Sequence, residues 1–573
     1  MSDAPQTANT VHVQQSTTCS HQSEGEAGRR VYQQFWLIAL TLLALFPFIN
    51  KAIHIDDPIF IWTAQHITHH PLDPYGFSAL WWSQTTPMWQ IQQNPPLASY
   101  FMATIGSIGG WSEKVLHLGF TLPALILILG TYHLALRLTN NALIAAAATL
   151  FTPGFLVSAT GLMCDISMVA VWMVAVLLWV KGLDGAKPSY LVISGLLIGA
   201  CALTKYFGMS LVPLLFAFSL LRERKLRVWL PYLLLPVAIL VAYELYTNHL
   251  YGYGLIGQAV QHKSYVRGME THAGRALVGL SFTGGCALTA LTFAPLLWSR
   301  KQILWGALLS TLLGAGFYFG WISMGSIYAH QEWLHTHKLP IAAQLTLYIA
   351  CSISVIGLAI TDWIRHRDSA SLLLLLWVAG TVLFAIVVNW DVNARSILPM
   401  IPAIGILIAR RLDYVKVNGR HLTFALVAIP IIVSGAIALW AAAGDMALAN
   451  TSRLAAAYVK QKSAQDSTTV RFEGRWGFEY YMLQMGARPL EPGDSDYSFG
   501  DLIVLPKYNT STYPFPLKTT AQEAVDFPVH SWIATMNPDA GGGFYFSGWG
   551  PLPFAVGPVP AQPYLLGRLV QTK

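Results

Sequence analysis

Two adjacent carboxylates, Asp56 and Asp57, follow the first apolar run of the chain and precede the apolar segment Ile59 to Trp62. This position would place them at a membrane surface, where a carboxylate can act as a general base toward a lipid-borne substrate. A helix cap is the alternative for Asp57, because Pro58 after it suits a first helical residue. We therefore interpret Asp57 as a cap, keep both residues as catalytic candidates, and assign the base to Asp56.

Four further charged residues lie at the ends of apolar runs: Asp165, Lys205, Lys338 and Arg395. A charge in mid-bilayer costs about 2.5–3.5 kcal/mol on insertion scales, so such residues need partners or a wet cavity. Asp165 and Lys205 could face one cavity, and cations gathered around it would suit a lipid phosphate. Snorkelling, capping or interfacial anchoring is the alternative for each of them alone.

Histidines at i and i+4, His66 and His70, could suggest a metal site, but Pro71 ends that helix and surface histidines are common. The five cysteines have no CxxC spacing and four of them lie in apolar runs, as core residues do. We assign no metal ligand and no certain cofactor. A divalent metal stays an open alternative.

Composition defines the class of protein. Hydrophobic residues make up 54% of the 573 residues and charged residues only 11%, which is typical of a polytopic membrane protein. The net charge of +7 comes from short basic clusters between apolar runs. Membrane orientation explains these clusters better than a nucleic-acid partner, and no nucleic-acid motif is present.

Apolar runs long enough to cross a bilayer predict about thirteen transmembrane helices with soft boundaries. They are 33–50, 115–137, 141–161, 163–181, 189–205, 206–221, 226–247, 276–298, 302–325, 341–361, 371–389, 396–411 and 421–442.

The distribution of basic residues predicts the orientation. With the N-terminus in the cytoplasm, seventeen Lys and Arg fall in inner loops and eight in outer loops before the tail. This asymmetry requires that Pro95 to Gly110 form a juxtamembrane helix that does not cross. The odd number of spans then places the C-terminal tail outside, on the same side as Asp56.

The chain divides by composition into a polar tail, an apolar region and a mixed C-terminal region. The last has strand-like segments at Thr469–Phe472 and Leu502–Leu505, a helix-like segment at Phe478–Met485, and glycine-rich turns after residue 540. The predicted domains are a disordered cytoplasmic tail 1–32, a transmembrane domain 33–442 with a large first external loop 51–114, and a small extracytoplasmic α/β domain 443–573.

Five segments in order resemble bacterial glycosyltransferase family 39 of the GT-C superfamily, whose relatives include protein O-mannosyltransferases and lipid A aminoarabinose transferases. The resemblance covers about the first 410 residues. Its motifs are Asp56-Asp57 with Phe60, Asn94-Pro95-Pro96-Leu97, Met163-Cys164-Asp165, Leu203-Thr204-Lys205, and Arg395 to Pro399. The family has Asp-Glu at the first motif, a Tyr in place of Phe60, and often His or Lys in place of Asn94.

The resemblance implies a GT-C fold in the bacterial inner membrane and transfer of a sugar from a polyprenyl-phosphate donor, without a covalent enzyme intermediate and with inversion. The acceptor would be a hydroxyl or phosphate of a protein, lipid or envelope glycan on the outer face. Asp56 would be the base, and Lys205, Arg395 and Lys338 would bind the donor phosphate. Asp165, Asn94, Pro95 and Pro96 would line the substrate cavity.

Two other classes of function remain as alternatives. A transporter or flippase of a lipid-linked substrate would also have many spans, but the sequence shows no pair of repeated halves. A non-catalytic assembly or sensor protein could be built on the same scaffold, and Asp56 argues against it only modestly.

Overall fold

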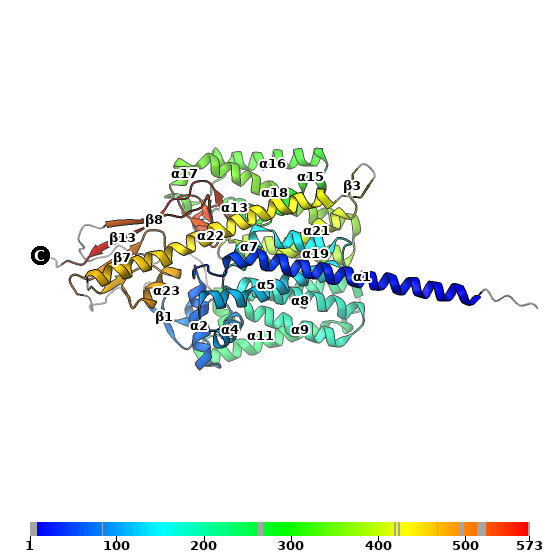
Figure 1. The fold of residues 1–573 in the computed structure, drawn as a ribbon, viewed down its shortest axis with the longest axis horizontal. Coiled ribbons are helices and arrows are strands. Elements are labelled where there is room, and N and C mark those ends of the chain that lie inside the picture. The colour runs from blue at the N-terminus through cyan, green and yellow to red at the C-terminus, as the bar shows by residue number, and fades with distance from the viewer. Residues whose placement is uncertain are drawn as a thin grey trace, which may run out of the picture.

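A computed structural model describes the chain except residues 1–7, 83, 224, 262–267, 418–419, 422–423, 467, 492–497, 511, 513–522 and 571–573. Most of the described residues form a bundle of long helices (Figure 1). A region with a β-sheet lies at one end of this bundle, and α1 projects from the other end. Helices α2, α4 and α23 lie at the same end as the sheet, which is where the candidate site forms.

Among the described residues, eight helices are long and apolar enough to cross a membrane, and the bent pair of α6 and α7 would make a ninth. The elements that form them are α1 Ala8–Leu45 with η1 Phe46–Phe48, α5 Glu113–Ala135, α8 Cys164–Asp184, η2 Tyr206–Ser210 with α10 Leu211–Glu223, α11 Leu230–Tyr251, α18 Lys338–His366, α19 Ser369–Leu383 with η6 Phe384–Val388, and α22 Phe424–Asp466; the bent pair is α6 Ala142–Leu150 and α7 Pro153–Ala159.

The other four predicted spans correspond to helices that are shorter, broken or, in the case of α16, less apolar. They are α9 Pro188–Thr204; α13 His272–Cys286 with α14 Thr289–Thr292 and α15 Ala294–Leu297; α16 Arg300–Tyr318; and α20 Ala394–Ile397 with η7 Leu398–Met400 and α21 Ile401–Leu412. The predicted class, a polytopic α-helical protein with a mixed C-terminal region, is confirmed. The count of thirteen spans stays a prediction.

The first external loop folds into short elements on the end of the bundle. They are α2 Asp57–His69, β1 Ser78–Leu80, β2 Thr85–Pro87, α3 Met88–Ile91 and α4 Leu97–Gly109. Thirteen residues make α4 about 20 Å long, and a bilayer core is about 30 Å thick. Its length therefore fits the predicted juxtamembrane helix.

The C-terminal region contains a five-stranded sheet of order β6-β5-β7-β13-β8. Strand β5 pairs in parallel with β6 and β7, and β13 pairs antiparallel with β7 and β8. The strands are β5 Val470–Phe472, β6 Arg488–Pro489, β7 Leu502–Pro506, β8 Glu523–Phe527 and β13 Gln562–Arg568, and the helix α23 is Trp476–Gln484. The two predicted strands and the predicted helix are thus confirmed as β5, β7 and α23.

Between β8 and β13 the chain returns to the helical bundle in a segment of short elements. They are β9 Ile533–Ala534, β10 Met536–Asn537, β11 Gly542–Gly543, η8 Ser547–Trp549 and β12 Ala555–Val556. The backbone amide of Ala394 donates to the carbonyl of Phe544 over 2.8 Å, so this return segment (residues 533–556) touches α20.

Two helices extend across predicted domain boundaries. The boundary between residues 442 and 443 falls inside α22, which continues unbroken from the bundle to the C-terminal sheet. Similarly, α1 begins at Ala8, so a helix occupies most of the segment that the sequence predicts to be a disordered tail.

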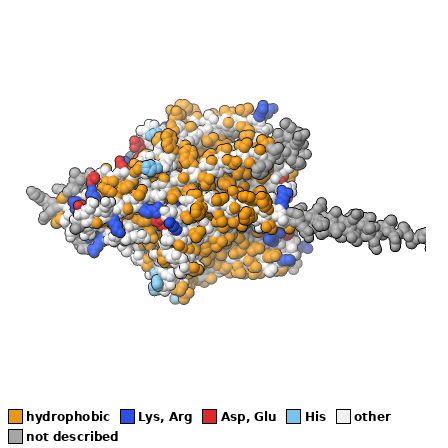
Figure 2. Space-filling view, in the orientation of Figure 1, with side chains coloured by type: hydrophobic (Ala, Val, Ile, Leu, Met, Phe, Trp, Pro, Cys, Tyr) orange, Lys and Arg blue, Asp and Glu red, His pale blue; other side chains and the backbone are white. Residues whose placement is uncertain are grey.

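The surface of the bundle is apolar where lipid would contact it. Figure 2 shows hydrophobic side chains spread over the helices, with charged side chains mainly toward the two ends. Large apolar side chains are highly exposed there, among them Leu245, Leu304 and Ile432. Such an area is unfavourable in water and is expected against acyl chains.

Candidate active site

Asp56 lies immediately before α2, and its side chain makes no hydrogen bond to the end of that helix. Its Oδ2 instead lies 3.2 Å from Nη1 of Arg395, and 29% of the Asp56 side chain is exposed. The preceding Ile55 has a φ of 44°, a conformation that costs a β-branched residue energy and is usual only where the surroundings impose it. Asp56 is therefore an accessible carboxylate at a constrained turn.

Asp57 has a different environment, and its predicted place as the helix cap is wrong by one residue. It is the first residue of α2 and is fully buried. Its Oδ2 accepts from the amide of His54 over 3.0 Å, and its Oδ1 accepts from the amide of Leu162 over 2.9 Å. Burial raises the pKa of Asp57 to about 7, against the opposing effects of Lys51 and the two amides. Through these hydrogen bonds, Asp57 links the first external loop to the connection between α7 and α8.

Arg395 is the partner of Asp56 and is carried by the short helix α20. The Asn393 side chain caps that helix by accepting from the amide of Ser396 over 2.9 Å. Nη1 of Arg395 also contacts the sulfur of Met163, and its Nε has no hydrogen-bond partner among the described residues. Because guanidinium groups bind phosphate through paired N–H donors, a partly buried arginine with an unused donor suits a phosphate ligand.

Asp165 and Lys205 form a second ion pair beside the first. Nζ of Lys205, which ends α9, lies 2.5 Å from Oδ1 of Asp165 in the first turn of α8. Oδ2 of Asp165 is buried without a partner among the described residues. Met163, whose sulfur contacts Arg395, is the N-cap of α8 and precedes Asp165 by two residues, so the two ion pairs lie near each other. The structure thus brings together four residues that the sequence singled out.

The Asn94-Pro95-Pro96 motif lies at the entrance to α4. The hydroxyl of the buried Tyr75 donates to the carbonyl of Asn94 over 2.7 Å. Helix α4, which follows the motif, packs against α8 and α9, the helices next to Asp165 and Lys205. Pro95 and Pro96 are buried. The motif therefore shapes the loop wall behind the charged group.

Lys338 lies elsewhere. It begins α18, and its ammonium group lies 5.8 Å from the ring centres of both Phe317 and Tyr318. No described hydrogen bond or ion pair joins it to Asp56, Lys205 or Arg395. Its geometry favours the alternative that the sequence left open, an interfacial anchor.

Sequence reasoning missed a buried network beneath Arg395. Nζ of Lys51 lies 2.5 Å from Oδ2 of Asp445, and both side chains are fully buried. The Tyr545 hydroxyl donates to the same Asp445 oxygen over 2.7 Å, and the Tyr545 ring lies 5.8 Å from the Arg395 guanidinium. The available signal was Asp445 itself, the first charged residue after twenty-one uncharged residues of α22, because a buried carboxylate needs a partner.

A second missed network anchors the return segment. Ser547 donates from its hydroxyl to Asp391 over 2.6 Å and also lies within hydrogen-bond reach of Glu270. Glu270 pairs with Arg275, and their side chains are 1% and 6% exposed. Burial raises the pKa of Asp391 to about 7; Glu270 adds to this and Ser547 opposes it. The glycine-rich segment after residue 540 therefore contributes to the site region as well as making turns.

The predicted histidine pair lies on the surface of α2. The rings of His66 and His70 stack with their centroids 4.6 Å apart. Across the part of the chain that the structure describes, no group of three or more His, Cys, Asp or Glu side chains could hold a metal ion.

The fold and site define a membrane protein with paired charges at one end of its bundle, and the sequence is similar to an enzyme family. The family of dolichyl-phosphate-mannose-protein mannosyltransferases matches residues 93–246. This segment includes Asn94, Asp165 and Lys205, and it confirms the resemblance to the mannosyltransferases expected from the motifs. The match does not reach Asp56 or Arg395. No curated protein sequence matches the chain.

Distant likenesses exist among solved structures. An Archaeoglobus fulgidus oligosaccharyltransferase, tethered to an acceptor peptide, is 13% identical with a TM-score of 0.49; the match covers 81% of this chain and 64% of that one, so the chain spans less than two thirds of its length. ArnT from Cupriavidus metallidurans, bound to undecaprenyl phosphate, is 14% identical with a TM-score of 0.38 and coverages of 82% and 93%. Arabinosyltransferase EmbB from Mycobacterium smegmatis is 13% identical with a TM-score of 0.34 and coverages of 85% and 46%.

Proposed function

We propose that the protein is a GT-C glycosyltransferase that moves a sugar from a polyprenyl-phosphate donor to an acceptor on the outer face of the membrane. The observation that carries this proposal is the contact between the accessible carboxylate of Asp56 and the partly buried guanidinium of Arg395, with the Lys205–Asp165 pair beside it. A base and two phosphate-binding cations are what this transfer requires. The acceptor group is a hydroxyl or phosphate of a protein, lipid or envelope glycan.

In the proposed reaction Arg395 first binds the donor phosphate, and Asp56 then acts as the base. When the donor phosphate binds Arg395 and Lys205, it replaces Asp56 as the partner of the guanidinium and leaves that carboxylate free. Asp56 then takes the proton of the acceptor hydroxyl while the oxygen of that hydroxyl attacks the anomeric carbon of the sugar. The bond from that carbon to the phosphate oxygen breaks, and the charge on the departing polyprenyl phosphate is stabilised by the two cations. One displacement inverts the anomeric carbon.

An apolar groove supports a lipid-linked donor. It lies between α18 and α19 with η6, has a volume of about 350 Å³, and is lined only by apolar side chains, among them Ala359, Ala379 and Ile386. Its end at Ile386 belongs to η6, which packs against α20, the helix that carries Arg395. A polyprenyl chain in this groove would have its phosphate end near the cations.

We place the protein in the bacterial inner membrane, with the N-terminus in the cytoplasm and the C-terminal sheet in the periplasm or outside the cell. The charge asymmetry of the loops supports this orientation. The site and the sheet lie at the same end of the bundle, so both would face outward (Figure 1).

The test is reconstitution of the full chain into vesicles with a panel of labelled polyprenyl-phosphate sugars and native membrane extract as the acceptor source. We expect label to leave the donor lipid, and Asp56→Asn to reduce that rate by about 10²–10⁴-fold, the range for loss of a general base. Asp184→Asn is the matched control, since Asp184 pairs with Arg137 at the far end of α8.

Each outcome decides between the candidate functions. Transfer by the parent and the control alone supports the proposal. Movement of the intact labelled lipid across the bilayer without transfer would instead support a transporter or flippase. Equal transfer by Asp56→Asn contradicts the assignment of the base.

A further inference from the structure

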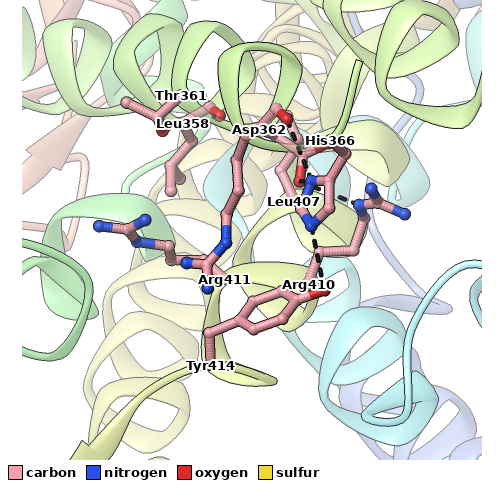
Figure 3. Close-up of a pocket in the computed structure, with 9 residues that line it drawn as sticks. Leu358, Thr361, Asp362, His366, Leu407, Arg410, Arg411 and Tyr414 are labelled. Atoms are coloured by element: carbon pink, nitrogen blue, oxygen red, sulfur yellow. Dashed lines mark hydrogen bonds and ion pairs between the residues drawn. The ribbon is translucent and has the colours of Figure 1, made fainter. Parts of the chain in front are cut away.

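A small pocket lies between the ends of α18 and α21, in the part of the bundle away from the sheet (Figure 3). Its lining includes three arginines, Arg365, Arg410 and Arg411, with Asp362 and Tyr414. The proposed transfer reaction uses none of these residues.

One of the three arginines is neutralised within the protein. Nε of Arg410 lies 3.0 Å from Oδ1 of Asp362, and its other donors reach the carbonyl of Leu138 and the hydroxyl of Ser371. His366 binds the same Asp362 oxygen and contacts the hydroxyl of Tyr414, as the dashed lines in Figure 3 show. Asp362, His366, Arg410 and Tyr414 all line the pocket.

The other two arginines form no ion pair with any carboxylate among the described residues. The Arg365 guanidinium lies 3.8 Å from the ring centre of Tyr414, and that of Arg411 lies 5.4 Å from the ring of Trp298. Stacking occupies the faces of a guanidinium and leaves the N–H donors at its edge available. Arg365 and Arg411 are also close enough for their charges to repel. Nε of Arg411 donates to the carbonyl of Leu297 over 3.2 Å, but neither arginine makes another hydrogen bond to a described residue. Two neighbouring cations whose terminal N–H groups are free favour an anion between them.

The size of the pocket limits what can bind. Its enclosed volume of about 10 Å³ holds no more than about one water molecule, so a ligand must sit at the mouth. Arg365 and Tyr414 are exposed at that mouth. Just before Arg365, the same helix presents Ile360 and Ile364, 43% and 59% exposed, as a surface for acyl chains.

The positive-inside rule explains why basic residues are numerous on this side of the membrane. That rule depends only on how many basic residues there are, and not on how they are arranged. It does not require two arginines from separate helices to converge and stack on aromatic rings. We propose that Arg365 and Arg411 bind the phosphate headgroup of an anionic phospholipid at the mouth of this pocket. Basic pockets between transmembrane helices recognise lipid headgroups in this way, and the inference does not depend on the transfer reaction.

The test measures lipid binding by the full chain in nanodiscs. Thermal unfolding is followed in phosphatidylcholine alone and with added phosphatidylglycerol, and native mass spectrometry counts the lipids that remain bound. We expect phosphatidylglycerol to raise the unfolding temperature of the parent, and Arg365→Gln with Arg411→Gln to lose that rise and to retain the lipid about tenfold less well. Lys181→Gln with Lys187→Gln is the control, because it removes two positive charges on the same predicted side.

The outcomes are distinguishable. If both double variants lose the stabilisation by phosphatidylglycerol equally, the lipid is attracted to any positive charge and the proposed site is wrong. The site is also wrong if the arginine variant keeps the full stabilisation. If inorganic phosphate in phosphatidylcholine discs gives the same stabilisation, the source of the phosphate is soluble and the lipid assignment is wrong. Should the double variant unfold in phosphatidylcholine alone, the exposed single change Arg365→Gln provides the same comparison.

Discussion

Arg395 is the residue on which distant parts of the chain converge. It contacts Asp56 of the first external loop, Met163 before α8 and the ring of Tyr545 in the return segment. An arginine held from several directions has little freedom to move, so its guanidinium is preorganised for a ligand. The site is therefore assembled by tertiary packing and not by any local motif.

The first residue-scale prediction concerns this preorganisation. Arg395→Lys keeps the positive charge but loses the planar pair of donors, and we expect kcat/KM for the donor to fall about 10–100-fold. Arg395→Gln also removes the charge and should cost about 10³-fold or more. Initial rates with labelled donor lipid measure both. Equal activity of the Lys and Gln variants would show that the charge of Arg395 plays no part.

A second residue-scale prediction concerns His54. Burial lowers its pKa from 6.5 to about 4; Asp445 opposes this and Lys51 adds to it. The folded protein therefore keeps His54 neutral while the unfolded chain binds a proton below pH 6.5. The contribution of His54 to stability should be constant above pH 6.5 and should fall between pH 6.5 and 4 by up to about 3 kcal/mol.

Thermal unfolding across that pH range measures the effect. His54→Phe removes the titrating group, so its unfolding temperature relative to that of the parent should rise as the pH falls from 6.5 to 4. His330→Gln, at an exposed position, is the control and should leave the profile unchanged. A profile of His54→Phe parallel to that of the parent would contradict the assignment.

At the scale of elements, the sequence predicted what depends on local composition. The positions of long apolar helices, β5, α23 and β7 follow from length, hydropathy and alternation, which are properties of neighbouring residues. The candidate site could be predicted from the sequence only in part. Asp56 and Arg395 were singled out separately, but their contact joins positions 339 residues apart. Tyr545 looked like part of a turn, because no local pattern shows that its loop folds back under Arg395.

Helices α18 and α19 carry the element-scale prediction. Ala379 lines the apolar groove and is exposed, so Ala379→Trp should fill the groove without disturbing the core. We expect KM for a long-chain donor to rise about tenfold, with little change for a donor of two isoprene units. Leu376→Trp is the control, because Leu376 is exposed on the same helix and does not line the groove. Equal effects on both donors would place the lipid chain elsewhere.

At the scale of the whole molecule, the orientation in the membrane is testable. An odd number of spans places the two termini on opposite sides. Alkaline phosphatase fused to the C-terminus should therefore be active, and a fluorescent reporter that folds only in the cytoplasm should be bright at the N-terminus. A fusion truncated after Lys225 should behave as cytoplasmic. Termini on the same side would make the number of spans even and contradict the predicted thirteen.

The unbroken helix α22 has a mechanical consequence for the whole protein. Its 43 residues make a rod about 65 Å long that is both the last apolar helix and the support of the C-terminal sheet. Since α22 itself has no break between Phe424 and Asp466, the sheet has no hinge within this helix on which to turn away from the bundle. Near the midpoint of α22, Asp445 forms an ion pair with Lys51 and accepts a hydrogen bond from Tyr545. If a bulky acceptor tilted the sheet, α22 would tilt with it and would displace the buried charges that contact Asp445.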